Sequence, residues 1–532
     1  MIYYENIIIG AGPAGLQLSY FFEKSNIPYI ILEKSDSCAS FFNTFPHSSE
    51  LISINKKYTG NTNKDFNLRH DWNSLLNDEN FLFNEYTEEF YPNSKYLFEY
   101  LNDFYKNNNL KIKFNTHVKN INKNDSGEYL IEIENYPDIF YCKKLIIGTG
   151  LSLPNIPQIK MKVQSKNKIL HYGEFGKNYF ANKENLIQYK NKKVLIIGSG
   201  NSAYELANIL NNYTSSILIL GNTRKFSIVS HYAGDLRSIN YKFFDTFYLK
   251  SLNAIDNNDF KSQTQNFLQS IEQIDNKNSP FHNKYIYKYN NNKLYENDNS
   301  NYFDEIIFCT GWKFDTKIFN FKVNMTLNNK YPSVKYNYES DSNDNLFFIG
   351  SLMHSLDYRK SSGGFIHGFR YLIKLFVNMN YNLKFDVKYF KFSGNLSFYD
   401  DLTKHIMYRI NNSSSLYQMF GIMCDLFYYD DETKNIFYHN DLSLHYIKNK
   451  MDTFPNKFNI LMLNYGPEIY DIRNIGDFNK KNPSFIHPEI LLYENSKHID
   501  TIVIEEDLFA DFSSDKYYNK ILRTLKSCNL LI

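Results

Sequence analysis

The sequence predicts an α/β protein with two dinucleotide-binding (Rossmann-like) units, one inserted into the other, and a C-terminal α+β extension. Two observations predict the units: an apolar run leads into the glycine loop GAGPAGL (10–16), and another leads into GSGNS (198–202). A third marks the extension, because beyond about residue 384 the chain becomes aromatic and polar without another glycine loop. The predicted boundaries are 1–164 and 306–384 for the split first unit, 165–305 for the inserted unit and 385–532 for the extension.

Hydrophobic periodicity predicts the elements of the first unit in chain order. They are a strand at 6–9, a helix with apolar positions 16, 20 and 21, a strand at 28–32, a helix at 94–107 and strands at 111–118, 127–134 and 144–147. Together they predict a parallel sheet with a small antiparallel excursion. A further strand at NLFFIGS, ending at Gly350, and a helix after Gly363-Gly364 complete this unit.

The inserted unit repeats the strand–glycine loop–helix order. Its predicted elements are a strand from Val194, a helix at 202–210, a strand at 216–220, a hairpin at IYKYNNNKLYEN and a strand in DEIIFCTGW. Thr-Gly turns at 149–150 and 310–311 fit a chain that leaves the first unit and later re-enters it.

Composition excludes several classes of protein. The 532 residues carry 59 basic and 57 acidic side chains, so neither nucleic acid nor a membrane is expected as a partner. No run approaches the ~18 apolar residues that span a bilayer, and no secretory signal fits before Gly10. The five cysteines are scattered without a CxxC pair, and no metal-ligand spacing occurs. We therefore expect a cytoplasmic protein without a bound metal.

Each glycine loop predicts a pyrophosphate site, because glycines let the backbone approach the phosphates and the next helix directs its N–H groups at them. Glu33 lies 23 positions after Gly10, near the ~20 expected for a carboxylate that binds a ribose 2′-hydroxyl of FAD or NAD. The equivalent position of the inserted unit is Gly221, and Arg224 and Lys225 stand nearby. This cation pair favours the 2′-phosphate of NADP, and a solvated basic turn is the alternative. Two cofactors are thus predicted: bound FAD, and NADP as its electron donor.

These motifs resemble the flavin-containing monooxygenase class. Longer blocks resemble the FAD-dependent oxidoreductase domain-containing protein 2 family, ER flavoproteins linked to the degradation of misfolded proteins. The blocks are LISINKKYTG (51–60), FNLRHDWNSLL (66–76), HYAGDLRSIN (231–240), HSLDYRKSSGGFIHGFRY (354–371), SLYQMF (415–420), LNYG (463–466) and FIHPE (485–489). The resemblance covers almost the whole chain and implies the fold and FAD binding. No secretory signal or retention tail is expected in this chain, so the role of the ER proteins in degradation is not carried over.

The resemblance also implies one catalytic residue. Monooxygenases of this class place an asparagine beside the flavin, where it steadies the oxygenated cofactor, and Asn55 in SINKK is similar to it. A turn asparagine is the alternative. The candidate cofactor-binding residues are Gly10, Gly12, Pro13, Ala14, Gly15, Glu33, Lys34, Phe42, Asn55, Val118, Gly150, Gly198, Gly200, Asn201, Ser202, Arg224, Lys225, Gly350, Gly364 and Phe365.

Three polar clusters each allow a functional and a structural interpretation. The first, which either lines the flavin site or forms a hydrogen-bonded loop, contains His354, Asp357, Tyr358, Arg359 and Lys360. The second contains His70 and Asp71 and favours a helix start over acid–base catalysis. The third is a candidate to face the nicotinamide and contains His231, Asp235 and Arg237. The helix after Gly363-Gly364 either directs backbone donors at the flavin N1 and C2 carbonyl or is a plain helix start.

The sequence therefore predicts an FAD-dependent, NADPH-using oxidoreductase. A flavin monooxygenase-like enzyme acting on a small molecule and molecular oxygen fits best. The alternatives are an NADPH-driven reductase of a disulfide or quinone, and a flavin-stabilised interaction protein whose C-terminal region binds a protein partner. The missing CxxC counts against a dithiol mechanism. The second glycine loop counts against a scaffold, which would not need it.

Overall fold

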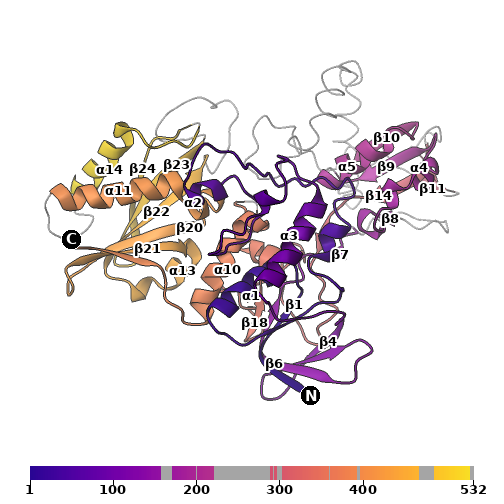
Figure 1. Ribbon diagram of the computed structural model, residues 1–532, viewed down its shortest axis with the longest axis horizontal. Coiled ribbons are helices and arrows are strands. Elements are labelled where there is room, and N and C mark those ends of the chain that lie inside the picture. Colours follow the sequence, from indigo (N-terminus) through magenta and orange to yellow (C-terminus); the bar gives the residue numbers. More distant parts are fainter. Residues whose placement is uncertain are drawn as a thin grey trace, which may run out of the picture.

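The chain folds into three parts that lie in a row, each built around one sheet. The computed structural model describes residues 1–156, 170–198, 200–220, 288–290, 293–295, 302–358, 360–391, 396–466, 485–507 and 509–527. The first sheet lies in the middle, the second at one end and the third, which contains the C-terminal region, at the other end (Figure 1). No helix among the described residues has the length and apolar character needed to cross a bilayer.

The first sheet has a parallel core with an antiparallel hairpin at one edge. Its order is β3-β2-β1-β6-β5-β4. One side of β6 pairs with β1, whereas on the other side its first half pairs with β5 and its last three residues pair with β18. The predicted parallel sheet with an antiparallel excursion is thus confirmed. The strands are β1 (Ile2–Ile9), β2 (Ile30–Leu32), β3 (Ile112–Lys113), β4 (Val118–Lys123), β5 (Tyr129–Ile133), β6 (Ile139–Ile147) and β18 (Leu346–Phe348).

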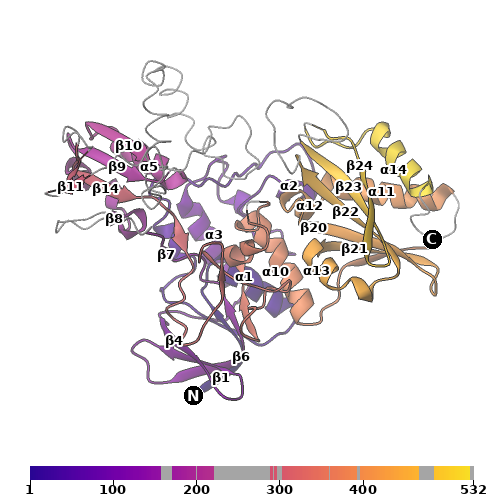
Figure 2. The ribbon, with the colours of Figure 1, turned by 180° about the vertical axis from the view of Figure 1, so that it is seen from behind.

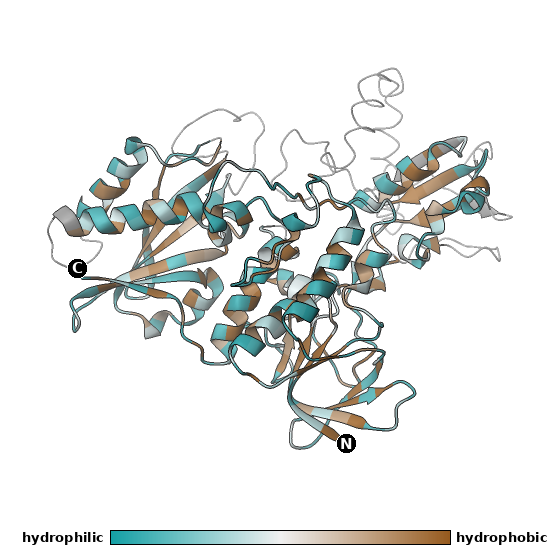
Figure 3. Cartoon of the chain, viewed as in Figure 1, coloured by the Kyte–Doolittle hydropathy of each residue, from teal (hydrophilic) through white to brown (hydrophobic). Residues whose placement is uncertain are grey.

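Both faces of this sheet are buried, which explains its near-continuous apolar strands. On one face Ile8, Ile31 and Ile146 pack in a core with three helices, and the alternate residues Ile7 and Ile147 belong to a second core on the opposite face. The three helices are α1 (Pro13–Lys24), α3 (Ser94–Asn107) and α10 (Ile366–Asn380). The strands are largely brown in the hydropathy view, as burial requires (Figure 3).

The second sheet is parallel, in the order β10-β9-β14-β8. Helix α5 follows β9, and a short antiparallel sheet, β11-β12-β13, contains the predicted hairpin. The elements are α4 (Lys183–Ile187), α5 (Asn201–Leu210), β8 (Leu170–His171), β9 (Lys193–Ile197), β10 (Ser216–Leu220), β11 (Lys288–Asn290), β12 (Lys293–Tyr295), β13 (Tyr302–Phe303) and β14 (Glu305–Phe308).

Two segments of the chain that lie side by side connect the first sheet to the second. The outgoing strand β7 (Leu153–Pro154) pairs antiparallel with the returning strand β15 (Trp312–Lys313). The Asn155 N–H also donates to the Gly311 carbonyl at 2.9 Å. Strand β18, which follows the return, then joins the first sheet. Short strands β16 (Met325–Thr326) and β17 (Tyr331–Pro332) lie between β15 and β18 in the chain.

The third sheet is antiparallel, in the order β19-β21-β20-β22-β23-β24. One face packs against α11 and α14 (Figure 2). Residues of the other face, such as Leu426 and Ile460, join the core that contains α10. The elements are β19 (Val387–Lys391), α11 (Leu396–Asn412), α12 (Ser414–Gln418), β20 (Met423–Asp430), β21 (Asn435–Ser443), α13 (Leu444–Asn449), β22 (Lys457–Tyr465), β23 (Ile486–Glu494), β24 (Lys497–Val503) and α14 (Asp515–Ser527).

Two expected elements differ from the structure. Of the strand expected at 111–118, only residues 112–113 form a strand, β3, and residue 118 begins the next strand, β4. The helix expected at WNSLL is wrong: residues 72–73 form a bend, residues 74–76 have no regular secondary structure, and the nearby helix is α2 (Lys64–Leu68). There the Asp71 carboxylate accepts the N–H groups of Asn73 and Ser74, so the local bonds of a helix cap form without a helix behind them.

Candidate functional site

The first glycine loop connects β1 to α1, and three glycines give it its shape. Gly10 has φ +103°, and a Cβ atom there would lie 3.0 Å from the Gly148 carbonyl oxygen. A Cβ atom on Gly15 would lie 2.1 Å from the Gly10 carbonyl oxygen. A Cβ atom on Gly12, at the N-cap of α1, would meet no described heavy atom within 4 Å. Two glycines therefore allow close packing, whereas Gly12 borders open space in front of the helix N–H groups.

Glu33 is held beside this loop. Its side chain is 6% exposed, and its two carboxylate oxygens accept the N–H groups of Ala11 at 2.7 Å and Ser35 at 2.9 Å. Each carboxylate oxygen has a further lone pair. The group can therefore also accept hydroxyl hydrogen bonds from a ribose next to the start of α1. The next residue, Lys34, is exposed.

The ends of β6 and β18 meet the same helix start. A Cβ atom on Gly350 (φ +71°) would lie 2.5 Å from the Cβ of Ala14, and one on Gly150 (φ +66°) would lie 3.4 Å from Ser351 Oγ. Gly10, Ala14, Gly150 and Gly350 are thus gathered at the carboxyl edge of the first sheet. That edge is where open parallel sheets bind their ligands. Phe42 is half-buried and Val118 is buried.

The second glycine loop repeats this geometry between β9 and α5. Gly198 has φ +117°, and a Cβ atom there would lie 2.2 Å from the Cys309 carbonyl oxygen at the end of β14. A Cβ atom on Gly200, the N-cap of α5, would meet no described heavy atom within 4 Å. Asn201 and Ser202 form the first turn of α5. The remaining residues expected here lie outside the described residues: Arg224, Lys225, His231, Asp235 and Arg237.

A protein-family model matches the part of the chain that contains both glycine loops. The model for pyridine nucleotide-disulphide oxidoreductases matches residues 7–350, from β1 to the turn after β18. The chain belongs to this family. The match therefore takes in both glycine loops and both joining strands.

Relatives of this family member extend the likeness into the third sheet. FAD-dependent oxidoreductase domain-containing protein 2 of Mus musculus is 32% identical over 447 residues, covering 79% of this chain and 63% of the relative. The Danio rerio protein of that name is 33% identical, covering 80% and 65%. These matches confirm the resemblance seen in the sequence blocks, and the chain spans less than two thirds of either relative. A flavin-containing monooxygenase structure from Stenotrophomonas maltophilia is 14% identical with a TM-score of 0.45, covering 66% of this chain and 91% of that one.

The cysteines of this disulphide oxidoreductase family member do not form a redox pair among the described residues. Cys38, Cys142, Cys309 and Cys424 are all buried and free. Burial raises the pKa of the Cys38 thiol to about 12 and raises the pKa of the other three as well. Thiols of this kind are poor nucleophiles, because the thiolate is the reactive form.

The polar cluster before Gly363 forms a hydrogen-bonded loop. The buried Asp357 carboxylate accepts from Ser361 Oγ at 2.5 Å and from the Gly363 N–H at 3.0 Å, and it lies 2.9 Å from His354 Nδ1. These contacts fix the turn that leads to α10. Phe365 is the N-cap of α10 and precedes its first turn. A Cβ atom on Gly364 would lie 3.0 Å from the His354 ring. His354 and Asp357 thus belong to a hydrogen-bonded loop, and their lining of the flavin site stays a prediction. Lys360 is exposed, and Arg359 lies outside the described residues.

The Asn55 side chain is hydrogen-bonded to a neighbouring loop, residues 87–90. Its side chain is 1% exposed, and its Nδ2 donates to the carbonyls of Thr87 at 2.9 Å and Glu89 at 3.3 Å. Its backbone N–H donates to the Phe90 carbonyl. The Oδ1 atom is buried without a partner among the described residues. This arrangement favours the structural alternative, and the catalytic role of Asn55 stays a prediction.

The sequence motifs do not single out His367, in the first turn of α10. It is 1% exposed, and its ring stacks on Trp72 at 4.3 Å and on Phe365 at 5.6 Å between ring centres. Neither ring nitrogen has a partner among the described residues. Burial, together with Arg370, lowers the pKa of this histidine well below its usual range, so the ring is neutral. His367 lies on the buried face of α10 at the spacing of an ordinary core residue, so the sequence alone does not distinguish it from one.

Arg370, one turn further along α10, is likewise not singled out by the sequence. It is fully buried, and its guanidinium donates to the backbone carbonyls of Leu68 at 2.7 Å, Asp71 at 3.0 Å and Ser74 at 2.8 Å. These bonds fasten the 68–74 segment to α10. Trp72 is thereby held where its indole covers His367.

Proposed function

We propose that this protein is an FAD- and NADPH-dependent oxidoreductase of the flavin monooxygenase type that acts on a small molecule. One observation carries the proposal: the chain contains two strand–glycine loop–helix sites of the same geometry, each with a glycine at the helix N-cap that borders open space. One site suits a resident flavin nucleotide, and the other suits its electron donor.

The first site suits FAD. The N–H groups at the start of α1 would bind the pyrophosphate, with Gly12 leaving room for it, and Glu33 would accept the ribose hydroxyls. The α10 start after Gly364 would direct its dipole at the ring system. The names of the two relatives with 32% and 33% identity include FAD dependence, which supports this assignment. When bound, the flavin would take two electrons from a nicotinamide and pass them on.

The second site suits NADP. The start of α5, with Gly200 at its N-cap, would bind the pyrophosphate of the nicotinamide nucleotide. Arg224 and Lys225 would bind the 2′-phosphate, because a guanidinium forms paired bonds to phosphate oxygens. No acidic residue stands near the equivalent of Glu33, which further favours NADPH over NADH.

Oxygen transfer is favoured over disulfide reduction. A disulfide reductase that works through a dithiol needs an accessible thiol pair, whereas the four described cysteines are buried with raised pKa values. A further relative, 28% identical over 41% of this chain, is named as a probable indole-3-pyruvate monooxygenase of Arabidopsis thaliana. In the proposed reaction NADPH, a proton and oxygen convert the substrate to a product that carries one oxygen atom, and the other oxygen atom leaves as water together with NADP⁺.

Isotope incorporation tests the proposal. The FAD-loaded protein would be given NADPH, heavy-isotope oxygen and a panel of sulfides, amines and ketones. A product that carries the heavy oxygen is expected. NADPH oxidation that reduces an added quinone, with no labelled product from any compound, would instead support the reductase alternative.

A further inference from the structure

Helix α12 (Ser414–Gln418) connects the C-terminal region with α2 and with the turn before α10. It lies between the third sheet on one side and both α2 and the turn before α10 on the other. Each side is fastened by buried polar contacts.

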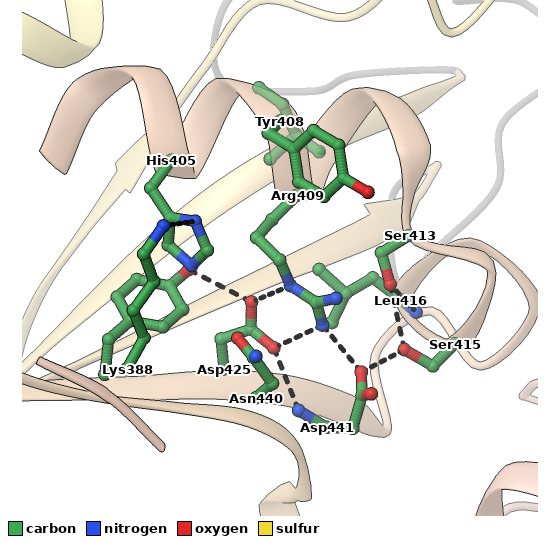
Figure 4. A network of polar contacts seen from close by, with 12 residues as sticks. Lys388, His405, Tyr408, Arg409, Ser413, Ser415, Leu416, Asp425, Asn440 and Asp441 are labelled. Atoms are coloured by element: carbon green, nitrogen blue, oxygen red, sulfur yellow. Dashed lines mark hydrogen bonds and ion pairs between the residues drawn. The ribbon is translucent and has the colours of Figure 1, made fainter. Parts of the chain in front are cut away.

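On the side of the third sheet, α12 is held by a buried charge network (Figure 4). Arg409 of α11 forms paired bonds to Asp425 at 2.6 and 2.8 Å and contacts Asp441 at 2.6 Å. The Asp441 carboxylate in turn accepts the hydroxyl of Ser415 on α12. Breaking such a network is unfavourable because it leaves a buried charge without a partner. The position of α12 on the sheet is therefore well determined.

On the other side, α12 is bonded to the residues that surround the α10 start. Gln418 Nε2 donates to the Arg69 carbonyl at 2.5 Å, and the Gln418 carbonyl accepts the Ser362 N–H at 3.4 Å. The Arg69 guanidinium donates back to the carbonyls of Ser413 at 3.1 Å and Ile410 at 2.9 Å. Gln418 thus touches the 69–72 segment with its side chain and the glycine turn with its backbone.

A short relay connects Gln418 to His367. The Arg69 carbonyl accepts a second hydrogen bond, from Trp72 Nε1 at 3.0 Å, and Trp72 stacks on the His367 ring. A neutral donor suits this position, since the carbonyl needs a hydrogen bond rather than a charge. Removing the Gln418 amide would break the bond that ties the Arg69 carbonyl, and through it the Trp72 indole, to α12.

We infer that the C-terminal region forms part of the flavin site, and that Gln418 is a positioning residue that sets the start of α10 through Arg69, Trp72 and His367. This inference rests on the proposed function, because it needs a flavin against the α10 start. On this account the third sheet is not a separate binding module. It is a support for the end of the site where the ring system lies.

The test compares two variants of the full chain that each lose one buried hydrogen bond. Gln418→Met keeps the side-chain volume but removes the donor, and Tyr438→Phe removes the hydroxyl that Asp425 accepts at 3.0 Å on the far side of the network. FAD would be removed and titrated back, and the visible flavin spectrum and midpoint potential would be measured. We expect Gln418→Met to weaken FAD binding about 10-fold, the equivalent of one hydrogen bond, and to shift the spectrum and potential. Tyr438→Phe should lower thermal stability while changing none of the three.

Trp72→Phe keeps a ring on His367 but removes the indole donor to the Arg69 carbonyl, and it decides the question if Gln418→Met does not fold. Flavin affinity, spectrum and potential unchanged in these variants would overturn the inference while the proposed function stands. Equal effects of Gln418→Met and Tyr438→Phe would also overturn it, since general destabilisation would then suffice. A wild-type protein that binds no FAD would overturn the proposed function, and the inference with it.

Discussion

Replacing Gly12 and Gly200 by valine, one at a time, separates the two nucleotide sites. Both glycines are N-caps with extended backbone, Gly12 at φ −76° and Gly200 at φ −94°, conformations that valine adopts readily. Neither Cβ atom would meet a described heavy atom within 4 Å. The unliganded fold should therefore keep its stability within about 1 kcal/mol.

The nucleotides should not tolerate the change, because the added methyl groups would occupy the space in front of the helix N–H groups. Displacing a pyrophosphate from two such donors removes two charge-assisted hydrogen bonds, about 1.5–3 kcal/mol each. At 1.4 kcal/mol per tenfold, the expected loss is at least about 100-fold in affinity. Gly12→Val should lose FAD, whereas Gly200→Val should keep FAD and lose NADPH.

The assay is a pair of titrations on each variant, with FAD followed by flavin fluorescence and NADPH by calorimetry on the FAD-loaded protein. Thermal unfolding of the FAD-free proteins provides the control for folding. The reasoning is refuted if Gly12→Val binds FAD as tightly as the wild type. It is equally refuted if Gly200→Val loses FAD while retaining NADPH.

Four further predictions concern single positions. Arg224→Ala should weaken NADPH about 10- to 100-fold and leave NADH unchanged, as steady-state KM values for both would show. Gly350→Ala should lower the unfolding free energy by roughly 1–3 kcal/mol in a urea titration, because residue 350 has φ +71° and the new Cβ atom would lie 2.5 Å from the Cβ of Ala14. Burial lowers the pKa of His439 to about 4, so the neutral ring stabilises the fold above pH 6.5 and this contribution falls as the pH drops towards 4. His439→Gln should therefore lessen the loss of unfolding free energy between pH 6.5 and pH 4 by about 2 kcal/mol, measured by urea titration at both pH values. Asn55→Asp should destabilise the 87–90 loop, because a carboxylate cannot donate to its carbonyls; proteolysis there would show it, and intact resistance with increased peroxide release would instead support the catalytic role.

The sequence predicted the parallel elements well, because their signals are local. Strands such as β9 and helices such as α3 have a continuous apolar run or a clear 3.6-residue period. The positions of Gly10 and Gly198 followed from the loop motif, and their positive φ values are what the motif requires. The strand expected at 111–118 was too long, because a strand of two residues such as β3 carries no period that would mark its ends.

The candidate site was less predictable, since its contacts join distant parts of the chain. Asp71 was expected to begin a helix, but Arg370 draws the following carbonyls into hydrogen bonds with α10 instead. His367 and Gln418 have the spacing of core residues, and only the fold brings Trp72 between them. Asn55 was placed by resemblance alone, and its side chain turns to the 87–90 loop.

Anaerobic reduction by NADPH tests the central claim most directly, which is that one chain binds a flavin in its first site and the electron donor in its second. We predict that the purified protein contains one FAD per chain and that NADPH, in the absence of oxygen, removes the visible absorption of the oxidised flavin. NADH should do so only at much higher concentration. A protein that binds no FAD when it is supplied, or a bound flavin that NADPH leaves oxidised, would contradict the account.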